Sequence, residues 1–217
     1  QGGSLLLLGA APARLFADHL GARLVGDPVQ VAAELATRAG IVNLNGAWQP
    51  VDPSGAEVVG LRFPTRDTRK GGQPAATVSR LGKGYIAAVY GPVAVAQFRT
   101  HHPAIRGFIA GIVERVFPDP AVRIQGPPCV DIALRKTHDA RLSLHLLNRS
   151  NMQSADRYLA TDHVPSVGPI AVTIKVERKP ARVRWLPGSK PIRWTWDRGT
   201  LTLSIPRLDI HGILLID

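Results

Sequence analysis

The sequence contains a single cysteine, Cys129, among its 217 residues. One cysteine excludes an intramolecular disulfide and any metal site of the Cys-x-x-Cys type. Long apolar segments are missing as well, because runs such as Leu5–Leu8 are far shorter than the roughly 20 residues that a membrane-spanning helix requires. The first residues also lack the basic start and the cleavage site of a secretory signal peptide. We therefore predict no membrane association, and the location stays open between cytoplasmic and extracellular.

An initiator methionine is missing too, because the chain begins at Gln1 and its one methionine is Met152. We expect the sequence to be a fragment of a longer protein. Hydrophobic residues make up 45% of it and the mean hydropathy is +0.02, which allows a sizeable core. This length and composition fit one large or two small folded domains.

The charge is strongly unbalanced, with a formal net charge of +11 and a pI of about 10.8. A strongly positive net charge is one indication of an acidic partner such as nucleic acid. The basic residues are scattered, however, and the densest groups, 66–70 and 178–184, form no long block and do not alternate with aromatic residues. Arginine also outnumbers lysine amid abundant alanine, glycine and proline, as in proteins of GC-rich genomes. We therefore predict no nucleic-acid partner.

The first part of the chain predicts alternating strands and helices. Residues 4–8 form a short apolar run that ends at Gly9, as a buried strand does, and Pro12 then opens a helical pattern over residues 13–20. Residues 23–26 predict a second strand. A strand, a helix and a strand in this order form a βαβ unit, which predicts an α/β domain with a parallel sheet.

The same kind of pattern continues toward residue 118. Residues 29–39 are either a second short helix or partly extended, and residues 75–80 and 85–89 predict a hairpin across a glycine-rich turn. Residues 95–117 form the longest helical pattern, with a break expected at Pro103. Further strands are expected over residues 41–45 and 57–63.

Four prolines between residues 118 and 128 predict a domain boundary, beyond which helical periodicity disappears. Short alternating runs separated by turn residues follow, with a long loop expected over residues 151–169. Seven strands at this spacing predict two antiparallel sheets packed as a β-sandwich. The strands are expected at residues 130–136, 141–148, 170–178, 182–186, 192–196, 201–205 and 210–216.

Several stretches carry a resemblance. The second part contains R-L-S-L-H-L-L-N-R-S at residues 141–150, G-P-I-A-V-T-I-K-V at 168–176 and L-T-L-S-I-P-R-L-D-I-H-G-I-L-L-I-D at 201–217. These resemble the C-terminal β-sandwich of bacterial glycoside hydrolases, namely β-galactosidases with a trimerisation domain and α-L-fucosidase-like proteins. Upstream lie G-G-S-L-L-L-L-G-A at 2–10 and R-L-G-K-G-Y-I-A-A-V-Y-G-P at 80–92. These resemble the flavodoxin-like, class I glutamine-amidotransferase-like domain of the same enzymes.

The resemblance implies both a fold and a role. The fold is α/β plus all-β: a flavodoxin-like (glutamine-amidotransferase-like) three-layer domain over residues 1–120, then an antiparallel β-sandwich over residues 127–217. The role is assembly, homo-oligomerisation and support of a catalytic (β/α)₈ barrel N-terminal to Gln1, whose two carboxylates would cleave glycosidic bonds. Two alternatives stay open, a stand-alone carbohydrate-binding or scaffolding module and an amidotransferase-superfamily enzyme. The host is expected to be bacterial.

The residues themselves indicate no catalytic, cofactor-binding or metal-ligating set. An amidotransferase needs a cysteine nucleophile at a strand-to-helix elbow, whereas the turn after Leu5–Leu8 offers none and Cys129 lies beyond the domain. The aspartates fall in predicted turns and strand edges without pairing. The histidines lack the spacing of metal ligands, and His145 and His211, in predicted strands, are expected to be hydrogen-bonded structural residues. We therefore expect no cofactor.

Tryptophans are the remaining candidates for ligand or interface contacts. Trp194 and Trp196 are two residues apart and share one face of their predicted strand. With Trp185 they would form either a platform for stacking a sugar or a cluster in the sandwich core or a domain interface. Trp48, in a turn-rich segment, is a candidate to contact a neighbouring barrel.

Overall fold

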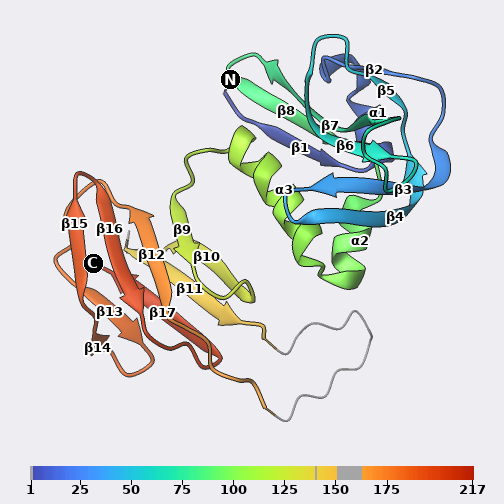
Figure 1. Ribbon diagram of the computed structural model, residues 1–217. Coiled ribbons are helices and arrows are strands. Elements are labelled where there is room, and N and C mark those ends of the chain that lie inside the picture. Colours follow the sequence, from blue (N-terminus) through green and yellow to red (C-terminus); the bar gives the residue numbers. More distant parts are fainter. Residues whose placement is uncertain (1, 140, 151–162) are drawn as a thin grey trace. The chain divides into compact units, whose positions relative to one another are not determined.

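The computed structural model describes residues 2–139, 141–150 and 163–217 (Figure 1). Its contacts divide the chain into two compact units, Gln1–Asp119 and Pro120–Asp217, here called unit 1 and unit 2. The loop predicted over residues 151–169 falls largely outside the described residues. No helix in the described ranges is long and apolar enough to cross a membrane.

Unit 1 is built on a six-stranded sheet with the order β1-β8-β7-β6-β3-β4. Only β1 and β8 are parallel, and every other neighbouring pair is antiparallel. Helices α1, α2 and α3 connect or cover these strands (Figure 1). The bounds are β1 Leu5–Leu8, α1 Ala10–Leu15, β3 Val29–Thr37, β4 Gly40–Trp48, β6 Glu57–Phe63, β7 Gln73–Leu81, β8 Gly84–Val89, α2 Val93–Thr100 and α3 Pro103–Val116.

The predicted βαβ unit is wrong. Strand β2 (Arg23–Leu24) pairs antiparallel with β5 (Val51–Asp52) in a separate two-stranded sheet, so it never joins β1. The intervening helix is short: α1 covers six residues and is followed by a 3₁₀ turn, η1 (Ala17–His19), in place of one helix over residues 13–20. The flavodoxin-like three-layer arrangement, which rests on a parallel sheet, is not confirmed.

Local turn chemistry explains the parts of unit 1 that were predicted correctly. Strands β7 and β8 form the expected hairpin, with Leu81 opposite Gly84 and Gly82 at a φ of 60° in the two-residue loop. The helical pattern breaks before Pro103, the first residue of α3. The side chain of His102 caps α3, because its Nδ1 accepts a hydrogen bond of 3.2 Å from the Ala104 N–H. Residues 29–37, left open between helix and strand, form β3.

Unit 1 buries apolar side chains on both faces of its sheet. On one face, α3 packs against strand residues that include Ala33, Leu35 and Val89. On the other face, Ala13 of α1 and Leu20 pack against a second cluster from β1 and β8. The buried side chains of α3 recur every three or four residues, as an amphipathic helix requires: Ile105, Phe108, Ile112 and Val116.

Unit 2 is a pair of antiparallel sheets, as predicted. A five-stranded sheet has the order β10-β11-β17-β13-β14, and a four-stranded sheet has the order β15-β16-β12-β9. The inward residues of both sheets form one core, which includes Leu144, Val172 and Leu214. The bounds are β9 Val122–Gln125, β10 Val130–Lys136, β11 Leu142–Asn148, β12 Ile170–Lys175, β13 Val183–Leu186, β14 Lys190–Pro191, β15 Trp194–Asp197, β16 Thr200–Ile205 and β17 His211–Ile216.

We predict that Gly91→Ala destabilises unit 1 by about 2–4 kcal/mol, because overpacking a dense core forces side chains and backbone to shift. A Cβ atom at Gly91 would lie 2.2 Å from Cε3 of the fully buried Trp48. Gly107→Ala is the matched control, since a Cβ atom at that helical site meets nothing within 4 Å. This control should stabilise the protein by about 0.5–1 kcal/mol. Urea denaturation followed by circular dichroism measures both, and equal midpoints for the two variants would contradict the prediction.

Candidate functional site

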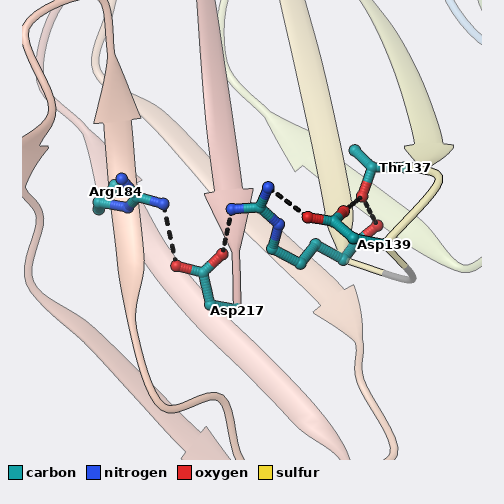
Figure 2. Close-up of polar contacts among 5 residues, drawn as sticks. Thr137, Asp139, Arg184 and Asp217 are labelled. Atoms are coloured by element: carbon teal, nitrogen blue, oxygen red, sulfur yellow. Dashed lines mark hydrogen bonds and ion pairs between the residues drawn. The ribbon is translucent and has the colours of Figure 1, made fainter.

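An ion-pair cluster joins the ends of several strands of the five-stranded sheet in unit 2 (Figure 2). Asp217, directly after β17, accepts hydrogen bonds from Arg184 Nη2 at 3.1 Å and from Arg141 Nη1 at 3.4 Å. Arg141 also pairs with Asp139, whose carboxylate accepts a hydrogen bond from the Thr137 hydroxyl. The cluster therefore links β13, β17 and the β10–β11 turn.

The electrostatics of this cluster suit a structural role. The Arg141 guanidinium, followed by the Thr137 hydroxyl, lowers the pKa of the Asp139 carboxyl to about 2. Such a group is ionised across the physiological range, so it has no proton to donate as a general acid. The arginine and aspartate side chains pair with one another and so hold the strand ends together.

The predicted tryptophans of unit 2 all lie at one margin of the sandwich core. Trp194 and Trp196 are half-buried on the inward side of edge strand β15, and the Trp196 indole donates a 3.0 Å hydrogen bond to the Val176 carbonyl. Trp185 lies across the backbone of Gly212, where a Cβ atom would fall 2.1 Å from its ring. All three rings thus pack against the same core.

Trp185 also lines a surface hollow of about 640 Å³ at the end of the sandwich. Ile192 contributes a further apolar side chain to this hollow, and Arg193 a cationic one. Arg207 and Asp209 also line it, and Arg207 Nε donates a 2.7 Å hydrogen bond to Asp209. An aromatic surface bordered by charged hydrogen-bonding groups is the composition of many small-molecule sites.

Trp48 is fully buried in unit 1, where its ring contacts a buried cation. Cζ of Arg62, on β6, lies 5.0 Å from the ring centroid, and Arg62 is only 8% exposed. Burial lowers the pKa of the Arg62 guanidinium from its ordinary value. The cation–π contact contributes about 0.5–2 kcal/mol, whereas burying an unpaired charge costs several kcal/mol. The Arg62 side chain makes no ion pair or hydrogen bond with the residues that the structure describes.

Arg62 was missed at the sequence level because of a β-bulge. Simple alternation along β6 places Leu61 inside and Arg62 outside. The register with β7 shifts on both sides of Gly60, which leaves Leu61 40% exposed and turns Arg62 inward. Nothing in the local sequence other than this glycine marks the bulge.

Two histidines of unit 2, His145 and His211, form a pair on neighbouring strands. Nδ1 of His145 lies 3.3 Å from Nε2 of His211, and their ring centroids are 5.4 Å apart. Across the described ranges, no group of three or more histidine, cysteine, aspartate or glutamate side chains is arranged to hold a metal ion. The hydrogen bond between the two rings joins β11 to β17.

No protein-family model and no curated protein matches this sequence. Solved structures share its fold. The α-L-fucosidase isoenzyme 2 from Paenibacillus thiaminolyticus has a TM-score of 0.68 at 13% identity, over 91% of this chain and 33% of that chain. A catalytic mutant of Gan42B, a GH42 β-galactosidase from G. stearothermophilus, has a TM-score of 0.56 at 15% identity, over 99% of this chain and 28% of that chain.

The chain therefore spans only about a third of the length of the solved structures that it resembles. At these identities the likeness concerns the fold. Both units of the chain take part, because nearly all of its residues are covered. The chain has the fold of one part of larger glycoside hydrolase chains.

We predict that the Asp139 carboxyl titrates near pH 2 and that Arg141→Ala raises its midpoint toward the ordinary value of 3.8. Because the folded pKa is depressed, this contact stabilises the protein fully above about pH 4 and ceases to do so as the pH falls toward 2. Carbon-detected NMR of the side-chain carboxyl measures the midpoint. Arg135→Ala, on the neighbouring strand β10, is the control and should leave it unchanged. A midpoint that Arg141→Ala does not move would refute this assignment.

Proposed function

We propose that this chain is the non-catalytic C-terminal region of a glycoside-hydrolase-like protein, in which it supports a catalytic barrel and serves assembly. The observation that carries the proposal is the coverage: 91% of this chain matches 33% of a fucosidase chain, and 99% of it matches 28% of a β-galactosidase chain. In this proposal, unit 1 is the assembly domain between the barrel and the sandwich, and unit 2 is the terminal sandwich.

The distribution of carboxylates agrees with a non-catalytic role. Glycoside hydrolysis uses two carboxyl groups that face each other across the scissile bond. Glu57, Asp131 and Asp209 each line a different hollow, and none of these three hollows contains a second carboxylate from the described part of the chain. Glu57 is paired with Arg115, Asp131 with Arg149 and Asp209 with Arg207. In this proposal the glycosidic chemistry belongs to another part of the protein.

Exposed apolar side chains support the assembly role. Val95 and Phe98 lie three residues apart on α2, and so on one side of it, with 51% and 68% of their surface exposed. Leu15, the last residue of α1, is 83% exposed. In this proposal these side chains belong to a contiguous apolar surface that another protein part covers.

Isolation of the protein from its source cells tests the proposal. We expect an intact mass tens of kilodaltons above the 23.3 kDa of this chain, and an oligomer on analytical ultracentrifugation. Phe98→Ser should weaken assembly at least tenfold without changing the circular dichroism spectrum, because it replaces an apolar contact. Arg106→Ser, at an exposed site on α3, is the control. A native mass of 23.3 kDa would refute the proposal, and an unchanged oligomer in Phe98→Ser would remove α2 from the interface.

The hollow beside Trp185 favours a second candidate function, carbohydrate binding by unit 2. An indole next to Ile192 offers an apolar surface to the C–H face of a sugar ring, while Arg193 and Asp209 offer hydrogen bonds to its hydroxyl groups. This role is compatible with the first one, since a binding site on the sandwich would hold substrate near a catalytic barrel.

We predict that the chain binds β-galactosides or α-fucosides with a Kd of roughly 1 mM, which calorimetry can measure. Trp185→Ala should weaken binding at least tenfold through loss of the stacking surface. Trp194→Phe is the matched control, because Trp194 packs on the same core without lining the hollow. Equal binding by the two variants, or no binding by the unaltered chain, would eliminate this candidate.

A further inference from the structure

Two buried hydrogen-bond donors meet in unit 1 without an acceptor. Nε of Arg62 and Nε1 of Trp48 are both inaccessible and both lack a partner among the described residues, although the two side chains are in contact. Buried polar groups are normally hydrogen-bonded, so two adjacent exceptions require an explanation. A guanidinium carries five donors and cannot lose its charge in a protein, which makes Arg62 the more demanding of the two.

The surroundings of Arg62 supply no counter-charge. Its neighbours across the sheet are Leu35 on β3 and Gln73 on β7, both neutral. Glu34, adjacent to Leu35, is also buried, but successive strand residues face opposite sides of a sheet. Its Oε1 accepts a hydrogen bond from Asn43, and its Oε2 has no partner among the described residues. The cation is thus held in place by an aromatic ring and left without an anion.

The terminal nitrogens of Arg62 differ from its Nε in being accessible. Neither of them is among the buried atoms that lack a partner, and neither is bonded to a described residue. With 8% of the residue exposed, the opening is narrow. A guanidinium presents N–H donors in a fork whose geometry a carboxylate matches.

We propose that Arg62, supported by Trp48, is a docking site for a single side-chain carboxylate, supplied by an aspartate or glutamate of the protein part that covers unit 1. That the carboxylate comes from another part of the protein rests on the function proposed above. That Arg62 binds a carboxylate does not depend on that function. The net charge of +11 favours an acidic partner by charge complementarity. A carboxylate on a protein side chain also suits the narrow opening better than a sugar acid, whose ring would have to enter with it.

Acetate is the probe for the site in the isolated chain. At roughly 100 mM, against chloride at equal ionic strength, it should raise Tm by about 2–4 °C and shift the indole N–H resonance of Trp48. Arg62→Met should raise Tm in chloride, because it removes an uncompensated buried charge, and should abolish both acetate effects. Arg80→Met, at an exposed position on β7, is the matched control and should keep them. A lower Tm for Arg62→Met in chloride, or an acetate effect that persists in it, would overturn the site.

The longer protein isolated from source cells identifies where the carboxylate comes from. If a side chain of the partner region occupies the site, acetate no longer shifts the Trp48 resonance there, and Arg62→Met weakens attachment of that region. If acetate shifts the Trp48 resonance as much as it does in the isolated chain, no side chain occupies the site. That result would overturn a side chain as the source of the carboxylate and indicate a free small carboxylate as the ligand. A native mass of 23.3 kDa would refute the proposed function and this source together, whereas the acetate result for the site would stand.

Discussion

Each unit depends on a tryptophan ring that lies directly against a glycine backbone. Trp48 occupies the space where Gly91 has no side chain, and Trp185 does the same above Gly212. These contacts fill the end of one core and the margin of the other with the largest side chain available. Because both rings are fixed in this way, Arg62 beside Trp48 and the hollow beside Trp185 have defined walls.

The parts of the fold that could be predicted are those determined by residues close together in the sequence. The β7–β8 hairpin, the break before Pro103 and the strands of unit 2 follow from nearby glycines, prolines and alternating apolar residues, and the sequence sufficed for them. The pairing of β2 with β5 is decided by contacts distant in sequence. The short apolar patterns around α1 are equally compatible with a parallel βαβ unit. The local sequence therefore predicted the wrong partner for β2.

The candidate sites divide in the same way. Trp185 could be singled out from the sequence, because the chain has only four tryptophans and each is a candidate for ligand or interface contacts. Its neighbours in the hollow come from the β14–β15 and β16–β17 connections, which only the folded sandwich brings together. Arg62 could not be found at all, since the bulge at Gly60 reverses the alternation on which an inside–outside assignment relies.

The position of β17 governs the order in which unit 2 is completed. This strand is the last of the unit along the chain, yet it pairs with β11 on one side and β13 on the other. During synthesis, β11 and β13 therefore leave the ribosome with open edges that only β17 can join. The five-stranded sheet, and with it the sandwich core, can close only after residue 216 has emerged.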